Sequence, residues 1–220
     1  TGQQRVMRAN LAFLSRADGS CSFSSGKTVV WTSVNGPGDV HSSRKLNERM
    51  AIECCLRPAS GEADAVPYNN LLQRALEQTV NTKFFPRSSL QVTVHEVQSD
   101  GSLWATALCS AGLAVLDSGV PCSAPFCGVQ IARVKGDLVV DPDEWTESQS
   151  DASFLFALAA RGGPEAEEAV VIGSESSGVV AGFSLQEWKQ AEKLAQEAAK
   201  NIFRFFRECL QRKLSVESIG

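Results

Sequence analysis

The stretch SDGSLWATALCSAGLAVLDSGVP, residues 99–121, decides how this chain folds. After the turn Ser99-Asp100-Gly101, residues 103–116 are rich in alanine and leucine and carry almost no charge. A helix that is apolar on nearly all sides is buried rather than amphipathic. Its small residues allow other backbone to come close, so we expect this helix to be packed on most of its sides.

The segments before this helix are predicted to form mostly β-structure. Residues 20–23 and 28–34 flank a turn that contains glycine, which is typical of a hairpin. A third strand is expected at 51–56 and a helix at 68–80, where apolar residues recur with helical spacing. Apolar and polar residues then alternate over 90–97, which predicts a half-buried strand.

The segments after the central helix continue the mixed pattern. Short strands separated by glycine-rich turns are expected at 127–134, 138–140, 153–159 and 169–172. A long amphipathic helix closes the chain, and Ser184 and Glu187 form a capping box at its start. Lysine and arginine gather toward its end, where the helix dipole favours cations. Periodicity therefore predicts a sheet protein, α+β or α/β, with two long helices.

The composition excludes several classes of protein. With 220 residues, 43% hydrophobic and 21% charged, the chain has a globular balance. It has no apolar run of the roughly 18 residues that a membrane helix needs, so we expect a soluble, unsecreted protein without a membrane partner. The net charge of -4 argues against binding nucleic acid by bulk electrostatics, so any RNA contact is expected to be local or shared.

Cysteine and histidine give no sign of a metal site. The seven cysteines form an odd set without CxxC spacing, so we expect free thiols in a reducing compartment rather than structural zinc or disulfides. His41 lies in a polar segment and His95 in the alternating strand, and neither has a Cys or acidic partner at ligand spacing.

Four ordered segments resemble the RNase PH family. RADGSCSFSSGKTVVWTSVNGP (16–37) is similar to its opening hairpin, and 99–121 to its D-G-x turn and small-residue helix. FCGVQIARVKGDLVVDP (126–142) is similar to its next strand pair. NIFRFFRECLQRKLS (201–215) resembles the C-terminal helix of a ring subunit of the eukaryotic RNA exosome. Together these segments span nearly all of 11–215.

The resemblance implies a fold and partners. The fold is the α+β RNase PH fold, similar to domain 2 of ribosomal protein S5, with mixed sheets and two long helices packed on them. It forms a single domain over 1–220 with halves at 1–120 and 121–220. The implied partners are other RNase PH-type exosome subunits, cap proteins and single-stranded RNA threaded through a hexameric ring. The implied location is nuclear, nucleolar and cytoplasmic, in the processing and degradation of ribosomal and other RNA.

The resemblance also shows where the family's chemistry is lost. Phosphorolysis needs bound inorganic phosphate and cations that offset the charge of the RNA backbone. Active members bind this phosphate at a G-[TS]-R-[TS] loop, which here reads Gly101-Ser102-Leu103-Trp104. Ser102 is the remaining candidate phosphate ligand, because Leu103 replaces the arginine. Glu77 stands where active members carry another arginine, and its carboxylate would repel phosphate and RNA.

The remaining candidate site residues are acidic or cationic. Asp141 and Asp151 match acidic positions of active members and are the candidate catalytic residues, as general acid or magnesium ligands, on either side of a loop at 142–150. The alternative is a solvated turn at 141–144 and a strand-edge Asp151. Arg74 and Arg87 are candidate RNA contacts, or surface ion-pair partners. Trp104 either stacks on a base or packs in the core.

Two functions compete. The first is a structural exosome subunit that lines part of the RNA path in 3'–5' RNA processing and degradation without phosphorolysis. The second is a residual nuclease that acts through Asp141 and Asp151 on RNA or DNA as a homodimer, either phosphorolytic or metal-dependent and hydrolytic. No cofactor is certain, and Mg²⁺ and inorganic phosphate are expected only for an active enzyme.

Overall fold

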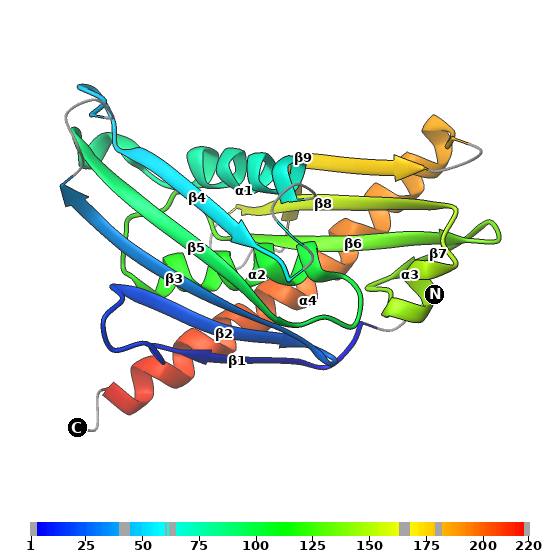
Figure 1. Ribbon diagram of the computed structural model, residues 1–220, viewed down its shortest axis with the longest axis horizontal. Helices are drawn as coiled ribbons and strands as arrows, with labels where there is room; N and C mark the ends of the chain where they lie inside the picture. The colour runs from blue at the N-terminus through cyan, green and yellow to red at the C-terminus, as the bar shows by residue number, and fades with distance from the viewer. Residues whose placement is uncertain are drawn as a thin grey trace.

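Two β-sheets organise the computed structural model, which describes residues 4–39, 45–59, 61, 65–162, 168–178 and 182–217 (Figure 1). The first sheet has the order β1-β2-β3-β5-β4, with strands β1 (Met7–Leu11), β2 (Gly19–Ser25), β3 (Thr28–Asp39), β5 (Ser88–Gln98) and β4 (Ala51–Arg57). The second has the order β7-β6-β8-β9, with strands β7 (Asp137–Val140), β6 (Phe126–Val134), β8 (Ala152–Arg161) and β9 (Glu168–Gly178). Neighbouring strands are antiparallel except β4 and β5, which are parallel.

Within the described ranges, four α-helices pack on these sheets. They are α1 (Val66–Thr79), α2 (Leu103–Asp117), α3 (Glu144–Ser148) and α4 (Leu185–Glu217), and a single 3-10 turn, η3 (Thr82–Phe84), follows α1. Helix α2 contacts β2 and β3 of the first sheet and β6 of the second, and its residues 105–115 are all buried. A Cβ at Gly112 would lie 2.2 Å from the Phe126 carbonyl oxygen, so a glycine is needed where α2 meets β6. The predicted buried helix is confirmed.

The predicted strands of the first half are also confirmed. In the hairpin, β2 and β3 pair so that Ser25 lies opposite Thr28. In β5, Leu90, Val92 and Val94 are buried between more exposed polar residues, as the alternation predicts. Strand β1, which the sequence did not predict, pairs with β2 and extends the sheet by one strand.

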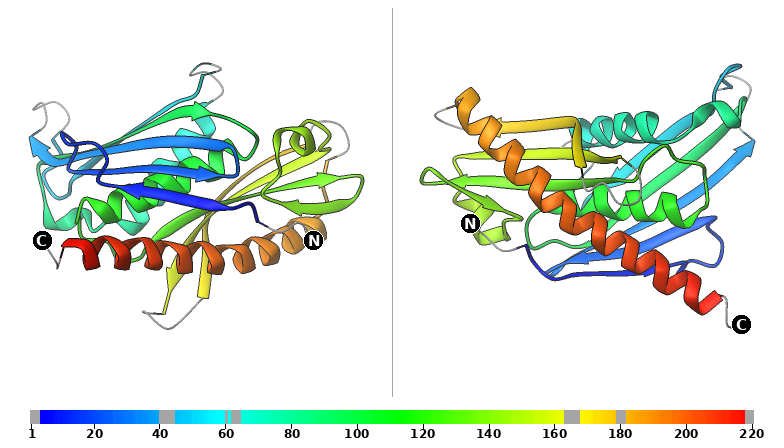
Figure 2. Two further views of the ribbon diagram at one scale, coloured as in Figure 1. Left: turned by 90° about the horizontal axis from the view of Figure 1, so that it is seen from below. Right: turned by 180° about the vertical axis from the view of Figure 1, so that it is seen from behind.

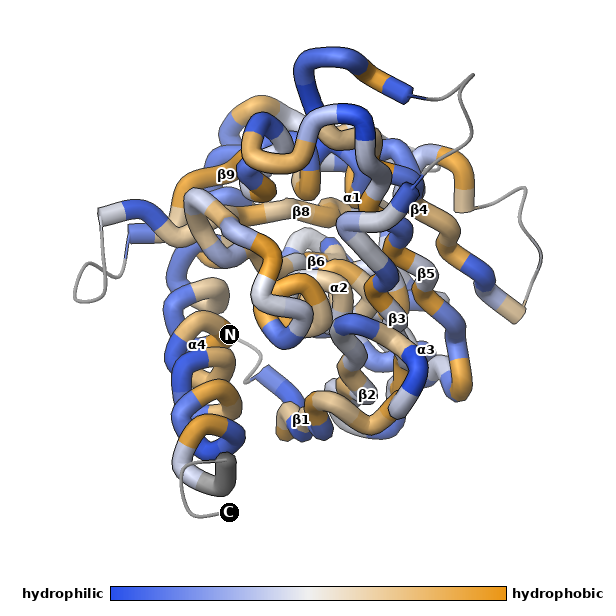
Figure 3. The backbone as a smooth tube through the Cα atoms, turned by 90° about the vertical axis from the view of Figure 1, so that its left-hand side faces the viewer, coloured by the Kyte–Doolittle hydropathy of each residue, from blue (hydrophilic) through white to orange (hydrophobic). Residues whose placement is uncertain are grey.

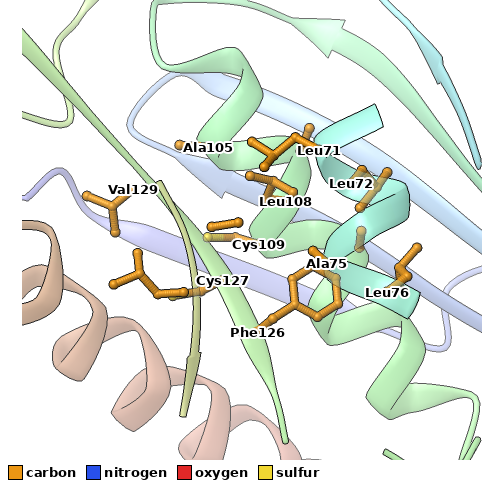
Figure 4. Packing of buried hydrophobic residues seen from close by; sticks show 14 of the residues in the cluster. Leu71, Leu72, Ala75, Leu76, Ala105, Leu108, Cys109, Phe126, Cys127 and Val129 are labelled. Atoms are coloured by element: carbon orange, nitrogen blue, oxygen red, sulfur yellow. The ribbon is translucent and has the colours of Figure 1, made fainter. Parts of the chain in front are cut away.

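One part of the hydrophobic core, which extends over both sheets and α4, brings together side chains of α1, α2 and β6 (Figure 4). Leu72 and Leu76 of α1 and Cys127 and Ile131 of β6 are completely buried. The tube coloured by hydropathy shows orange segments inside, around α2, and blue segments alternating with orange along α4 (Figure 3). None of the helices in the described ranges is both long and apolar enough to span a membrane.

Helix α4 runs diagonally across the back of the molecule, over the second sheet and on toward β1 and β2 (Figure 2). The predicted capping box is confirmed, because Ser184 N–H donates to Glu187 Oε2 (2.7 Å) and Glu187 N–H donates to Ser184 Oγ (3.2 Å). The predicted role of its cations is wrong, since α4 extends to Glu217 and its last turn has no basic residue. Lys213 instead forms an ion pair with the buried Asp117 (2.8 Å).

Candidate functional site

The N-terminus of α2 is where the sequence predicts a phosphate. Ser102 precedes the helix in the left-handed conformation (φ 49°, ψ 36°) and has no exposed surface. Its hydroxyl donates a hydrogen bond to the Pro142 carbonyl oxygen (2.8 Å), and its own carbonyl accepts one from Thr106 Oγ1 (2.8 Å). The hydroxyl proton is therefore already used within the protein, and Ser102 presents no open surface to a ligand.

A carboxylate of the same chain occupies this helix end. Glu147 on α3 accepts a hydrogen bond from the Ser102 backbone N–H at Oε2 (3.1 Å) and another from Gln130 Nε2 at Oε1 (2.7 Å). The N-terminus of a helix carries partial positive charge that stabilises an anion. Glu147 supplies that anion, so a phosphate arriving here would have to displace a bound carboxylate.

Helix α3 is fixed over the end of α2 by its own cap and by close packing. Asp143 Oδ1 accepts a hydrogen bond from Thr146 N–H (2.9 Å), and the hydrogen bonds from Thr146 lower the pKa of Asp143. A Cβ at Gly101 would lie 2.4 Å from the Asp143 carbonyl carbon. Part of the predicted loop 142–150 is thus a helix, and its Glu147 was missed. The signal in the sequence for this short helix was Asp143, because aspartate is a favoured N-cap residue and its side chain can accept from the backbone N–H three residues later.

Asp141 ties down the N-terminal segment. Its side chain is 15% exposed, and its Oδ1 accepts from Arg5 Nη2 at 2.6 Å. Its Oδ2 accepts from Ser25 Oγ (2.8 Å) and from Arg5 N–H (3.2 Å). Both carboxylate oxygens are therefore engaged in joining three segments of the fold, and the alternative reading of Asp141 as part of a solvated turn is wrong.

Asp151 lies on the opposite side of β6. Its backbone N–H donates to the Arg133 carbonyl (2.8 Å) as the chain enters β8, whereas Asp141 N–H donates to the Gln130 carbonyl (2.9 Å) beside β7. Because β7 and β8 lie on either side of β6, the two backbones are separated by two strand spacings across the sheet and by three residues along β6. Together these offsets give a separation of roughly 14 Å. Asp151 is exposed. The two candidate acids are therefore not brought together.

The two candidate arginines also lie apart from the end of α2. Arg74 and Glu77 are exposed on α1, and burial together with nearby Glu77 raises the pKa of the Cys54 thiol to about 12. Glu77 thus lies on the side of α1 that faces β4. Arg87 is exposed just before β5, whose far end leads to Ser102. Each arginine is accessible to solvent.

A cleft of about 270 Å³, called here the α2 cleft, opens beside this helix end. It is lined by Pro67, Tyr68, Trp104, Gln130, Ser153, Leu155, Glu175, Ser176 and Ser177. Trp104 stacks on Tyr68 with ring centroids 4.1 Å apart and an interplanar angle of 10°. One face of Trp104 is therefore packed against a neighbouring ring. None of these nine lining residues is cationic, and the buried Gln130 Oε1 has no hydrogen-bond partner among the residues that the structure describes.

The described ranges contain no cluster of three or more His, Cys, Asp or Glu side chains that could bind a metal ion. The seven cysteines are free thiols, as predicted. Burial raises the pKa of Cys109 to about 12 and that of Cys122 to about 11, so these thiols stay protonated and pack as apolar groups. His95 is exposed on β5, and His41 lies outside the described residues.

Two sheets that enclose a buried helix, with the N-terminus of that helix beside this cleft, define a class of protein. The chain belongs to the RNase PH family of 3' exoribonucleases: domain 1 of the family matches residues 3–121, and domain 2 matches residues 124–198. A particular relative is the exosome complex component RRP46 homologue of Caenorhabditis elegans. It is 38% identical over 218 residues, which cover 98% of each chain. The exosome complex component Rrp41 of Archaeoglobus fulgidus is 28% identical over 95% of this chain and 83% of its own.

Solved structures share the fold. The crystal structure of rice Rrp46 superposes with a TM-score of 0.84 over 96% of each chain at 23% identity. The Archaeoglobus fulgidus exosome with RNA bound to the active site gives a TM-score of 0.76 over 93% of this chain and 89% of that one, at 16% identity. The predicted RNase PH fold, with mixed sheets and helices, is therefore confirmed.

Proposed function

We propose that this chain is a structural core subunit of an RNA exosome, with a part in RNA processing and degradation but no phosphorolytic activity of its own. Similarity to the RRP46 homologue over nearly the whole chain supports the exosome assignment. The fold shared with an exosome that holds RNA in its active site supports a place beside the RNA path. The absence of phosphorolysis is supported by the end of α2.

The hydrogen bond from Ser102 N–H to Glu147 carries this proposal. Phosphate and a carboxylate cannot share one helix end, since two unit negative charges 4 Å apart repel by about 4 kcal/mol at the effective dielectric constant of a protein surface. Leu103 offers no guanidinium to offset that repulsion. The α2 cleft adds Glu175 and no cation. The site therefore disfavours phosphate as a nucleophile.

RNA contact is proposed at exposed arginines instead. Arg74 and Arg87 are accessible on α1 and at the start of β5, and each can neutralise a backbone phosphate of single-stranded RNA. In an assembled ring, Arg87→Ala and Arg74→Ala should each reduce cross-linking of RNA to this subunit. Unchanged cross-linking in both variants would show that the RNA path passes elsewhere.

The test of the inactive site uses the purified chain with 3'-labelled single-stranded RNA, Mg²⁺ and inorganic phosphate. We expect no release of nucleoside diphosphates, with an active family member as the positive control. Phosphate-dependent release would refute the proposal. Phosphate-independent cleavage that is lost in Asp151→Asn would instead establish the hydrolytic nuclease, which the separation of Asp141 and Asp151 does not favour.

Assembly is proposed with other RNase PH-type subunits and with cap proteins of the ring. Sheets of this kind expose unpaired strand edges that neighbours cover, so we also propose that the isolated chain forms a homodimer. Size-exclusion chromatography with light scattering measures this directly. A clean monomer at micromolar concentration would contradict the homodimer.

A further inference from the structure

A second, larger pocket in the described residues lies away from the α2 cleft, where the C-terminal half of α4 passes the end of β8. Its volume is about 640 Å³, and we call it the α4 pocket. Its walls come from α4, from the ends of α1, α2 and β8, and from β9. The lining residues are Gln78, Thr79, Leu116, Ser123, Ala124, Pro125, Ala159, Ala160, Arg161, Gly162, Ile172, Lys200, Phe203, Arg204, Phe206, Arg207 and Leu210. The volume lies within the range of about 300–1,000 Å³ typical of ligand pockets.

The floor of the α4 pocket is apolar. Phe206 is 2% exposed, and its ring meets Phe203 edge-on, with centroids 6.2 Å apart. Leu116, Ile172 and Leu210 add half-buried aliphatic surface. Such a floor excludes water from an inserted aliphatic or aromatic side chain, which is the main source of binding energy at protein interfaces.

The rim of the α4 pocket is cationic. Lys200, Arg204 and Arg207 are exposed at positions i, i+4 and i+7 of α4, and Arg161 adds a fourth cation from the end of β8. No acidic residue is among those that line the pocket, all of which belong to the described part of the chain. Four cations thus surround one apolar recess in a chain whose net charge is -4.

We infer that the α4 pocket docks an acidic segment of a partner protein, one that carries bulky apolar side chains between its carboxylates. Charge complementarity identifies the occupant, because guanidinium groups bind carboxylates through paired hydrogen bonds while the floor accepts an apolar anchor. RNA suits this pocket less well. Single strands bind on aromatic faces presented along an open groove, whereas Phe206 is a buried floor residue.

The inference is independent of the proposed absence of phosphorolysis. Ser153 and Leu155 near the start of β8 line the α2 cleft, while Ala159–Arg161 at its end line the α4 pocket. From Ser153 to Arg161 the strand spans roughly 27 Å. A partner could therefore occupy the α4 pocket whatever the α2 cleft does.

The test measures fluorescence anisotropy of a labelled 12-residue peptide in which phenylalanine and leucine alternate with aspartate and glutamate. It uses the full chain and three comparison probes of equal length. In the first, serine replaces the apolar residues. In the second, asparagine and glutamine replace the acids. The third is single-stranded RNA. We expect the acidic, apolar peptide to bind at least ~10-fold more tightly than any comparison probe, and to weaken as salt is raised.

A double charge reversal, Lys200→Glu with Arg207→Glu, should weaken binding of the acidic, apolar peptide by ~10-fold or more. The matched control is Lys189→Glu with Lys193→Glu, the same charge change at exposed positions of α4 outside the pocket. It should leave binding unchanged. Circular dichroism and thermal unfolding of both variants establish that each is folded.

Three results would overturn the inference. Equal or tighter binding of the serine peptide or of RNA would make the α4 pocket a general anion surface. A wild-type homodimer that dissociates in the Lys200→Glu, Arg207→Glu variant would make the occupant a second copy of the chain. A failure of the acidic, apolar peptide to bind, or binding that the double reversal does not change, would remove the site altogether.

Discussion

The two ends of β8 have opposite chemistry. Near Ser153 the strand lines the α2 cleft, whose charged lining residue is Glu175 and beside which Glu147 covers the helix end. At Arg161 it lines the α4 pocket, which is rimmed by cations and has no acidic lining residue in the described chain. Four cations therefore line the α4 pocket, whereas none is among the residues that line the α2 cleft.

This difference separates fold from function. The chain shares its overall fold with an exosome that holds RNA in its active site, yet a carboxylate lies at the N-terminus of α2. The Arg5 guanidinium lies nearest to that helix end, since it donates to the Asp100 carbonyl (2.7 Å), but it is already paired with Asp141 Oδ1 (2.6 Å). The guanidinium of Arg133, which pairs with Ala152 at the start of β8, is engaged with Glu187 Oε1 (2.9 Å) and the Gly182 carbonyl (2.9 Å). A shared fold therefore does not by itself transfer the activity.

The largest effect is expected for Phe206→Ala, which tests whether the floor of the α4 pocket belongs to the hydrophobic core while its rim does not. Removing a buried phenylalanine leaves a cavity and should destabilise the protein by about 4 kcal/mol. Phe206 also meets Phe23 of β2 edge-on, with centroids 6.5 Å apart, so both sheets lose contacts. Urea unfolding followed by circular dichroism measures the loss. Arg207→Ala on the exposed rim should change stability by less than about 0.5 kcal/mol. A larger change would show that the rim also contributes to the stability of the fold.

At the other end of β8, Gly101→Ala tests whether α3 is packed against the end of α2. Gly101 has φ 78°, and its new Cβ would lie 2.6 Å from the Pro142 carbonyl oxygen. Overpacking and left-handed strain together should lower the free energy of unfolding by about 3 kcal/mol. The control is Gly136→Ala, at φ 91° with nothing within 4 Å of the new Cβ. It should lose only about 1 kcal/mol. Equal losses would show that α3 does not press on Gly101.

Glu147→Gln tests the carboxylate itself. Its two oxygens accept from Ser102 N–H and Gln130 Nε2, so an amide nitrogen must face one of these two donors. We expect destabilisation of about 1.5 kcal/mol in urea unfolding, typical of a lost charge-assisted hydrogen bond. Glu144→Gln, an exposed acid in the first turn of α3, should lose no more than about 0.3 kcal/mol. Similar losses in the two variants would show that Glu147 stabilises the protein only through the charge that it adds to the helix, and not through its two hydrogen bonds.

Local pattern predicted the elements with strong periodicity. The hairpin of β2 and β3, the buried α2 and the capped α4 each follow from residues close in the sequence. Helix α3 was missed because five residues are too few to show a period. Glu147 was missed because its importance depends on Gln130 and Ser102, which only the folded chain brings near it.

The cations of α4 show the same limit in another way. From sequence, the lysines and arginines toward the end of this helix were assigned to the helix dipole. In the structure, Arg204 and Arg207 rim a pocket, because the ends of α1 and β8 pack beside that stretch of helix. The assignment failed because a pocket is a property of several elements, whereas periodicity describes one. Asp141 and Asp151 were both assigned to one catalytic site by resemblance. Their separation by β6 could not be seen from sequence, because it depends on the order of the strands in the sheet.

The smallest expected effect concerns the cap of α4, which also engages Arg133 at the acidic end of β8. Hydrogen bonds from the Ser184 backbone and hydroxyl, and from Arg133, lower the pKa of Glu187 below its ordinary 4.5. A carboxyl whose pKa is lower in the folded state stabilises the protein fully above the unfolded value, and that stabilisation is lost as pH falls through the folded value. Glu187→Gln should therefore be less stable than the wild type at pH 7, by less than Glu147→Gln.

The difference between Glu187→Gln and the wild type should shrink below pH 4.5 and vanish once Glu187 is protonated in the folded protein. Urea unfolding of both proteins between about pH 3 and 7 measures it. Glu197→Gln, an exposed acid further along α4, is the control for general charge effects on the helix. A stability difference that persists unchanged at the lowest pH would mean that the Glu187 side chain acts through packing. In that case the ion pair between Arg133 and Glu187 would not contribute to stability.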